Sequence, residues 1–270
     1  FDNDDAESMN GSVSATFRRQ LRDDLNGKLS FRGLFDERSF NSNDAAAEIF
    51  RVKDIFSLDN ATENLDVGSS SSTVRNTGVF AGLSLDFKDR YIFDGTFRYD
   101  GSSLFGSGNR YAPFGRISGV WRVSEEPFWN VPYMSDFRVR GSRGTAGSTP
   151  AFDAQYETYN VSSTGITLGQ AGNSKLRPET TTEYEFGTDF TLFNRLGVEL
   201  THARSSTEDQ ILLVGTPASL GFSEQWQNAG TLANRTWEVG LNLPVITNRD
   251  LQWSMRGTWD RTRTYITELF

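Results

Sequence analysis

The sequence has no cysteine and only one histidine, His202, among its 270 residues. Without cysteine there is no disulfide framework, no thiolate metal site and no cysteine nucleophile, which suits a cytosolic protein and equally a bacterial envelope protein that folds without bridges. A Ser-His-Asp triad would have to use His202, and no Gly-x-Ser-x-Gly turn marks a nucleophile for it. We therefore expect no catalytic residue, no metal ion and no cofactor.

Positive charge and long apolar runs are also scarce. The formal net charge is −8 and the pI is near 4.8, whereas nucleic-acid binding needs a basic face, so no nucleic-acid partner is expected. A mean hydropathy of −0.50 and the lack of an apolar run of about 18 residues exclude a transmembrane helix, but not a membrane barrel, whose strands are only half apolar. The opening FDNDDAESMNGS lacks the basic start and apolar centre of a signal peptide, so either the protein is not exported or its true N-terminus is missing.

What the sequence has in abundance is alternation of apolar and polar residues. In RYIFDGTFRYDGSS, residues 90–103, Tyr91 and Phe93 fall on one face, with Asp94 and Arg98 on the other. A period of two is typical of a β-strand with one dry and one wet face. No segment shows the pattern of a long amphipathic helix. We predict an all-β, antiparallel protein with ten strands, centred on residues 13–17, 29–35, 79–87, 91–99, 116–123, 137–140, 183–192, 196–201, 237–243 and 251–260.

The predicted connections are of two kinds. Tight turns are expected at 23–27, 88–90, 193–195 and 244–250, long polar loops at 36–73, 101–113, 146–180 and 205–224, and an intermediate turn at 124–135. Outer-membrane barrels have such short periplasmic turns and long extracellular loops. A soluble β-sandwich also alternates apolar and polar residues. Aromatic residues near the strand ends, strands of more than ten residues and loops of more than thirty favour a transmembrane barrel.

Three segments resemble the barrel of the SusC/RagA-type TonB-dependent outer-membrane transporters in their order and spacing. They are GLSLDFKDRYIFDGTFRYDGSSLFGSGNRYAPFGRISGVWRVSEEPFW at 82–129, FRVRGSRGTAG at 137–147 and NSKLRPETTTEYEFGTDFTLFNRLGVELT at 173–201. The similarity runs from about Thr77 to Leu269 and is weaker before it. The departures from the family pattern are His202, Ala203, Thr236 and Arg143. Arg143 would lie at the outer rim of its strand, where a cation meets lipopolysaccharide phosphates at little cost.

The resemblance implies a barrel of 22 strands with a plugged lumen. It also implies uptake powered by the TonB complex through that plug, and often a surface lipoprotein partner of the SusD type. Ten strands are fewer than half, and no segment is a candidate for the plug, so we expect residues 1–270 to form a single partial β-barrel domain without a plug. A ten-strand arc alone would leave backbone groups unpaired in lipid, so the remaining strands are expected to lie outside this sequence.

Charged residues of both signs share the face opposite the aromatic residues and are expected to line the lumen. They are Asp94, Arg98, Asp100, Arg116, Arg122, Arg138, Arg140, Glu183, Glu185, Asp189 and Arg256. In a full barrel such groups either contact a plug or hydrate a passage, and plug contact is favoured for most. Aromatic residues of the long loops are candidates for stacking on a sugar or a peptide, although packing within the loops explains them about as well. They are Phe152, Tyr156, Tyr159 and Phe222.

Three further features are better explained as structure than as sites. The acidic run Asp2 to Glu7 lacks the spacing of an EF-hand and is expected to be a solvated loop. The DGSS stretch at 100–103 has no lysine at Walker spacing and no following helix, which indicates a turn at the rim. The Asn-x-Ser/Thr matches, including Asn234 inside a strand, are chance occurrences in a bacterial envelope protein.

We interpret the chain as part of a TonB-dependent transporter barrel, embedded in the lipid of the bacterial outer membrane, that takes up a nutrient such as an oligosaccharide or a peptide. The alternative is a soluble or surface-attached β-sheet module that binds glycans through its loops. A third reading, an outer-membrane hydrolase, would depend on His202 as its base.

Overall fold

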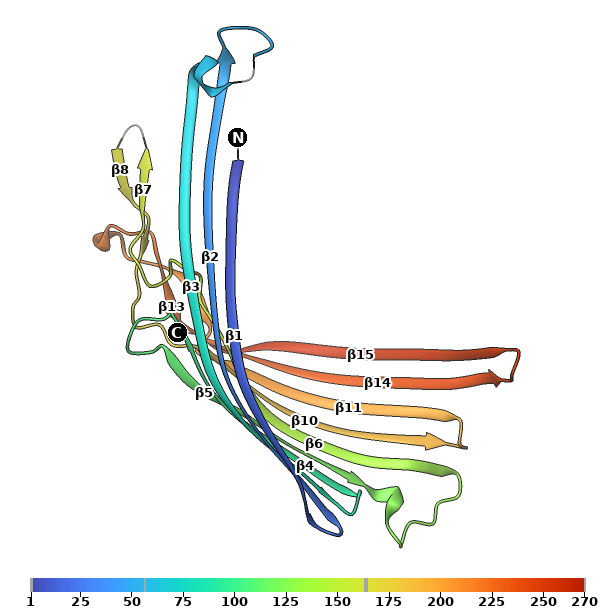
Figure 1. Ribbon diagram of the computed structural model, residues 1–270. Coiled ribbons are helices and arrows are strands. Elements are labelled where there is room, and N and C mark those ends of the chain that lie inside the picture. Colours follow the sequence, from blue (N-terminus) through green and yellow to red (C-terminus); the bar gives the residue numbers. More distant parts are fainter. Residues whose placement is uncertain (1, 56, 163–164, 270) are drawn as a thin grey trace.

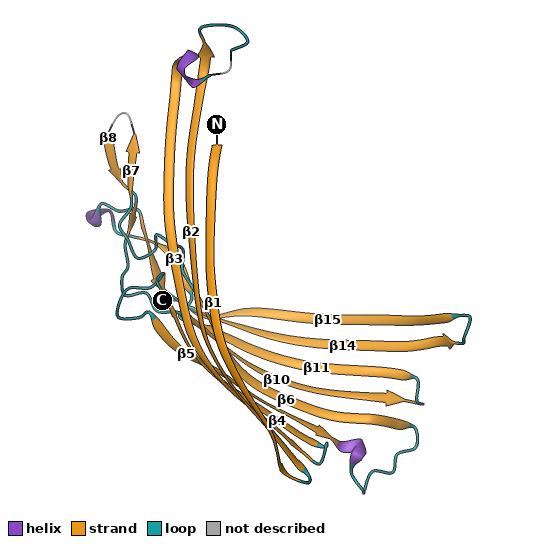
Figure 2. Cartoon of the chain, in the orientation of Figure 1, coloured by secondary structure: helices purple, strands orange, loops and turns teal. Residues whose placement is uncertain are grey.

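The computed structural model describes residues 2–55, 57–162 and 165–269. Within these residues the chain forms one ten-stranded antiparallel sheet, in the order β1-β2-β3-β4-β5-β6-β10-β11-β14-β15. Each strand of this sheet therefore pairs with the next one along the chain, apart from short strands that belong to the loops (Figure 2). The predictions of an all-β fold and of ten antiparallel strands are confirmed.

The elements fall into three groups. The sheet consists of β1 (Asp2–Arg22), β2 (Leu25–Phe50), β3 (Ala61–Phe87), β4 (Tyr91–Ser102), β5 (Tyr111–Arg122), β6 (Met134–Ser148), β10 (Glu179–Leu192), β11 (Leu196–Glu208), β14 (Thr231–Thr247) and β15 (Gln252–Glu268). The loop strands are β7 (Tyr159–Ser162), β8 (Gly165–Leu168), β9 (Gln170–Ala171), β12 (Ile211–Gly215) and β13 (Glu224–Asn228). Short 3₁₀ helices occur at η1 (Leu58–Asn60), η2 (Val123–Glu125) and η3 (Ala218–Leu220). No helix of the described part of the chain is long and apolar enough to cross a membrane.

Tight turns join the strands at one rim of the sheet. Between β3 and β4, the Arg90 amide donates to the Phe87 carbonyl at 3.1 Å, and both central residues, Lys88 and Asp89, have positive φ. The turn between β10 and β11 repeats this geometry at 193–194. Positive φ at both central residues gives a two-residue hairpin turn a twist that matches its strands. The turns predicted at 88–90 and 193–195 are confirmed.

Most of the large apolar side chains of the ten strands lie on one face, which we call the aromatic face. In-register pairing sets Tyr91 opposite Trp121 and Val239 opposite Trp259, and residues that pair directly point to the same side of a sheet. Trp121 is 38% exposed and Trp259 54% exposed. No second sheet covers these rings within the described ranges, because the one buried apolar cluster lies in the loops. An exposed face of this size fits lipid, and it does not fit a soluble sandwich.

The prediction of a long loop at 36–73 is wrong. β2 continues to Phe50 and β3 begins at Ala61, and the two strands pair from Asp36–Asn76 as far as Phe50–Ala61. The acidic run at 2–7 is also strand, paired with the 39–44 segment of β2. Alternation fails to reveal these extensions because both of their faces meet water, so the ladder needs no apolar side chains there. Figure 1 shows β1, β2 and β3 extending far beyond the other strands.

The other three predicted loops lie at the same rim, and two of them contain strands of their own. The connection after β6 holds the β7–β8 hairpin and β9, and the connection after β11 holds β12 and β13. β12, β13 and β9 form a separate three-stranded sheet. Short turns at one rim and long connections at the other are thus present as predicted (Figure 1).

Candidate functional site: the charged face and the loop cluster

The charged residues predicted to line a lumen lie on the side of the sheet opposite the aromatic face, which we call the charged face. Successive register pairs connect them across the strands: Asp94 lies opposite Ser118, Ser118 opposite Ser142, and Ser142 opposite Glu185. The predicted residues on this face are Asp94, Arg98, Asp100, Arg116, Arg138, Arg140, Glu183, Glu185, Asp189 and Arg256, together with Arg122.

Arg140 is the centre of the strongest cluster on the charged face. Its guanidinium forms an ion pair with Glu185 and a second one with Asp189, at 3.5 Å from Nε to Oδ1. A third bond runs from Nη2 to the hydroxyl of Thr201 on β11. Residue 187, directly opposite, is glycine, and a Cβ there would lie 2.6 Å from the Arg140 Cζ atom and displace the guanidinium from this position. The missing side chain lets one guanidinium cross β10 and tie three strands together.

A depression of about 330 Å³ lies beside this cluster and extends from β6 to β15. Arg138, Asp189 and Arg256, all predicted from the sequence, contribute to its lining. Glu199 lies directly opposite Asp189 on the same face. It is missing from the predicted set, although its place between Val198 and Leu200 in an alternating strand marks it as a charged-face residue. The depression thus presents charges of both signs.

Nearer the loops, Arg98 and Asp100 form an ion pair at 3.0 Å and line a second depression of about 210 Å³ with Arg110 and Phe105. The side chains of the remaining six predicted residues form no ion pair or hydrogen bond with any described residue: they are those of Asp94, Arg116, Arg122, Arg138, Glu183 and Arg256. The charged face therefore divides into groups that neutralise each other and groups that do not.

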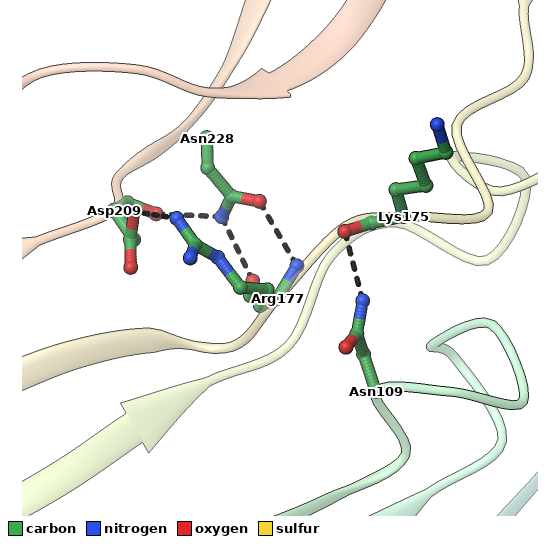
Figure 3. Close-up of polar contacts among 5 residues, drawn as sticks. All are labelled: Asn109, Lys175, Arg177, Asp209 and Asn228. Carbon is green, nitrogen blue, oxygen red and sulfur yellow. Dashed lines mark hydrogen bonds and ion pairs between the residues drawn. The ribbon is translucent and has the colours of Figure 1, made fainter.

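The long loops are held together by a polar cluster around Arg177, which precedes β10 (Figure 3). Its guanidinium forms an ion pair with Asp209 at 2.6 Å. Asn228 accepts from the Arg177 amide at 2.9 Å and donates to the carbonyls of Arg177 and Asp209 at 2.8 and 2.9 Å. In the same view Asn109 donates to the Lys175 carbonyl at 2.9 Å. Segments from three connections, those after β4, β6 and β11, are thereby joined.

Beside this polar cluster is the main buried apolar cluster of the described chain. Phe105, Leu176 and Ile211 come from three different connections and meet at 2%, 0% and 9% exposure. Ala154 completes the cluster and Trp226 packs against it. The connections thus form one folded unit instead of separate flexible loops. The sequence does not reveal this unit, because contacts between distant loops leave no periodic signal.

The predicted loop aromatics do not all come together. Phe152 and Tyr156 lie with ring centroids 6.3 Å apart and are 40% and 53% exposed. Tyr159 lies on β7 and donates to Glu157 at 3.0 Å, which raises the pKa of the Tyr159 hydroxyl. Phe222 is half-buried, next to η3. Of the four predicted loop aromatics, Phe152 and Tyr156 are the two whose exposed rings lie side by side.

His202 lies on the aromatic face, as the alternation predicts. Its ring stacks on Trp237 with centroids 4.2 Å apart, and Nδ1 lies 3.0 Å from the Thr236 carbonyl oxygen. This is a packed side chain without a nucleophile beside it in the described structure. Nor does any group of three or more His, Asp or Glu side chains among the described residues have the arrangement to hold a metal ion.

A wide antiparallel sheet with an exposed aromatic face, tight turns at one rim and long folded connections at the other defines part of an outer-membrane β-barrel. Residues 1–268 match the family described as TonB dependent receptor-like, beta-barrel. The chain belongs to this family.

Individual receptors and one transporter structure are also similar to this chain. The TonB-dependent receptor P26 of Formosa agariphila is 31% identical over 196 residues, which are 68% of this chain and 20% of that receptor. The TonB-dependent receptor SusC of Bacteroides thetaiotaomicron is 31% identical over 206 residues, 69% of this chain and 20% of SusC. The structure of the RagAB peptide transporter superposes with a TM-score of 0.89 at 22% identity, covering all of this chain and 31% of that one.

These likenesses confirm the predicted resemblance to SusC/RagA-type barrels and the outer-membrane location. The family consists of receptors and transporters and not of enzymes, which removes the hydrolase reading that depended on His202. The chain spans about a fifth to a quarter of the length of the curated relatives it matches.

Proposed function

We propose that this chain is one part of a barrel that takes up a nutrient, an oligosaccharide or a peptide, across the outer membrane. The observation that carries the proposal is the match of residues 1–268 to the receptor barrel family, on a sheet whose two faces separate aromatic from charged side chains. The 31% identity to SusC and the fold shared with the RagAB peptide transporter support the two substrate classes.

The charged face supports a plug domain as the partner inside the barrel. The predicted residues without an ion-pair partner in the described chain are Asp94, Arg116, Arg122, Arg138, Glu183 and Arg256. Charges that point into a barrel lumen pair with one another, with a plug or with water. We assign these six to plug contact and the mutually paired ones to the rigidity of the wall. Energy from the TonB complex would reach the barrel through that plug.

The loop unit supports substrate binding on the outer side. Phe152 and Tyr156 offer two neighbouring exposed rings on a folded base, and such rings stack on sugars or on peptide side chains. The resemblance to SusC/RagA-type transporters supports a SusD-type surface lipoprotein as the partner on that side.

Uptake by cells that produce the complete protein tests the proposal. Cells are supplied with labelled oligosaccharides or labelled peptides, with and without a functional TonB complex. We expect uptake of one class, and its loss without TonB. The double substitution of Phe152→Ala and Tyr156→Ala is expected to weaken substrate binding about tenfold or more, since stacked rings contribute roughly 1 kcal/mol each. Phe128→Ala removes an exposed ring from the opposite rim and is the matched control. Uptake of neither class by any strain would exclude the transporter role.

The alternative of a soluble or surface-attached glycan-binding module makes the opposite prediction for solubility. A module of that kind would be recovered as a monodisperse monomer without detergent. The exposure of Phe93, Trp237 and Trp259, between 43% and 54%, argues against it, because large exposed apolar surfaces drive association in water.

A further inference from the structure

Five arginines lie on the aromatic face of the later strands, where the neighbouring side chains are mainly apolar or aromatic. They are Arg143 on β6, Arg204 on β11, Arg235 on β14, and Arg261 and Arg263 on β15. None of the predicted lumen residues lies on this side. Arg143 alone stands out in the sequence as a rim cation; the other four come beside it only through the register of the sheet.

Four of the five stand in one continuous row of register pairs. The pairs are Ile117–Arg143, Arg143–Tyr184, Tyr184–Arg204, Arg204–Arg235 and Arg235–Arg263. Directly paired residues point to the same side, with Cβ atoms about 5 Å apart. We call Arg143, Tyr184, Arg204, Arg235 and Arg263 the arginine row. Arg261 is the next residue of β15 on the same face, two residues closer to the tight turn than Arg263, and it lies opposite Trp237.

The charge of this row is not compensated within the described structure. Like charges directly opposite each other on neighbouring strands repel, and no carboxylate forms an ion pair with any of the five arginines. Two of the arginines contact tyrosine side chains instead. Arg143 Nε donates to the Tyr184 hydroxyl at 3.1 Å, and the Arg235 guanidinium lies over the Tyr265 ring. Glu208 and Glu268 lie four and five residues beyond Arg204 and Arg263, about 13 Å or more at 3.3 Å per residue.

The strand tilt places the row near the outer boundary of the membrane. The register pairs continue from Ile117 through Gly95 on β4 to Leu83 on β3. Leu83 lies four residues from Phe87, where β3 enters its tight turn. At the other end of the row, Arg263 lies eleven residues from Gln252, where β15 leaves its tight turn, so the row is farther from the tight-turn rim there. Barrel strands tilt by about 35–45°, so a row of paired residues rises steadily through the bilayer. The apolar members of the row lie lower, and its arginines lie toward the loops.

The flanking rows mark the same boundary. On the tight-turn side, Phe186, His202 and Trp237 are paired in sequence across β10, β11 and β14. On the loop side the corresponding positions are Thr182, Ser206 and Ala233. Aromatic belts lie at membrane interfaces. A lipid-facing arginine is costly at the bilayer midplane but costs little at this depth.

Three of the arginines also form a shaped site. Arg235, Arg261 and Arg263 surround a surface depression of about 210 Å³, together with the rings of Trp237 and Tyr265. Guanidinium groups bind phosphate through paired N–H donors, and the two rings offer flat surfaces for the sugar that bears it. We propose that the arginine row and Arg261 bind the phosphorylated sugar headgroup of an outer-leaflet lipid, the lipid A part of lipopolysaccharide. The proposal rests on the outer-membrane location and is independent of the transported nutrient.

Binding of purified lipid A to the complete protein in detergent tests the proposal. Bisphosphorylated lipid A and its dephosphorylated form are titrated, and bound lipid is counted by native mass spectrometry. We expect the phosphorylated form to bind preferentially. The triple variant Arg204→Gln, Arg235→Gln and Arg263→Gln is expected to bind it about 100-fold more weakly, since each basic residue near an anionic membrane surface contributes about a factor of five.

The control variant removes three cations from the charged face: Arg18→Gln, Lys28→Gln and Arg32→Gln. It is expected to bind lipid A as the wild type does. Heat-modifiable migration on gels establishes that each variant is a folded barrel. Equal binding of both lipid A forms, or unchanged binding by the triple variant, overturns the proposal. So does a dimer in lipid-free detergent that the triple variant loses, because the row would then contact a second copy of the protein.

Discussion

Glu126, in the turn between β5 and β6, forms hydrogen bonds and an ion pair with residues at the ends of the neighbouring strands. One carboxylate oxygen accepts hydrogen bonds from the Tyr91 hydroxyl and, at 3.0 Å, from the Trp121 indole, and the other lies 3.2 Å from the Arg90 guanidinium. The hydrogen bonds from Tyr91 and Trp121 are the main cause that holds the pKa of the Glu126 carboxyl below its usual value of 4.5, and Arg90 adds to it.

We predict that Glu126→Gln lowers the thermal unfolding temperature of the barrel at neutral pH, because the amide places N–H donors toward Arg90. A lowered pKa means that the ionised form is favoured by folding. The stabilisation is therefore present above pH 4.5 and is lost as the pH falls through the lower, folded-state pKa. Unfolding followed from pH 7 to pH 3 should show this loss in the wild type and not in the variant. Glu125→Gln, one residue earlier and exposed, should behave as the wild type.

A second prediction at the residue scale concerns Arg140. Arg140→Ala leaves Glu185 and Asp189 without their shared cation, beside Glu199. Because these groups are partly exposed, we expect a loss of about 1 kcal/mol in the free energy of unfolding. Arg116→Ala, which breaks no ion pair of the described structure, should cost less. Denaturant titration of the folded barrel measures the free energy of unfolding of both variants. Equal losses would show that the Arg140 ion pairs do not stabilise the barrel.

The β2–β3 hairpin is much longer than a membrane crossing requires. β2 has 26 residues and β3 has 27, whereas a tilted transmembrane strand needs about 9–11. About 15 residues of each strand therefore project beyond the bilayer, roughly 50 Å at 3.3 Å per residue. Asn60 closes the tip, donating to the carbonyls of Val52 and Ile55 at 2.9 and 2.8 Å and accepting from the Val52 amide at 3.0 Å.

We predict that trypsin, added to intact cells, cuts this tip first, after Arg51 or Lys53, which are both exposed. Asn60→Ala removes three hydrogen bonds and should raise the cleavage rate about tenfold, since each bond contributes about 0.5 kcal/mol. Asn43→Ala, on the paired part of β2, is the control. Fragments identified by mass spectrometry locate the cut. Initial cleavage within residues 88–90 would contradict the assignment of the tight turns to the periplasmic rim.

At the scale of the whole molecule, the sheet ends in two strands that pair on one side only. β1 pairs with β2 and β15 with β14, and neither pairs with the other in the described structure. Unpaired backbone N–H and C=O groups cost several kcal/mol each in lipid, so a barrel in the membrane needs further strands to close it. This agrees with the likeness of the whole chain to 31% of a longer barrel protein.

We predict that the 270-residue chain, produced alone, does not behave as a monomer. Its open edges and exposed aromatic face should cause association in water, and detergent should cover the face but not the edges. Size-exclusion chromatography with light scattering should show large assemblies without detergent and a broad distribution with it. A single monomeric peak without detergent would contradict both the open sheet and the membrane assignment.

The sequence by itself determined which faces of the ten strands are apolar and which are charged. Apolar and polar residues alternate in any strand whose two faces meet different surroundings. The alternation therefore predicted that Phe93 lies on one face of the sheet and that Asp94 and Arg138 lie on the other. The same rule explains the error at 36–73, where both faces meet water and the alternation disappears although the strands continue.

Only the tertiary structure decided which residues on one face come together. The Arg140 cluster, the loop unit around Leu176 and the arginine row each join strands or loops that are distant in sequence. Alternation assigns a side to each residue but not a height, because height depends on the register between strands and on their tilt. Register is a property of pairs of strands, so it had to be observed in the folded sheet.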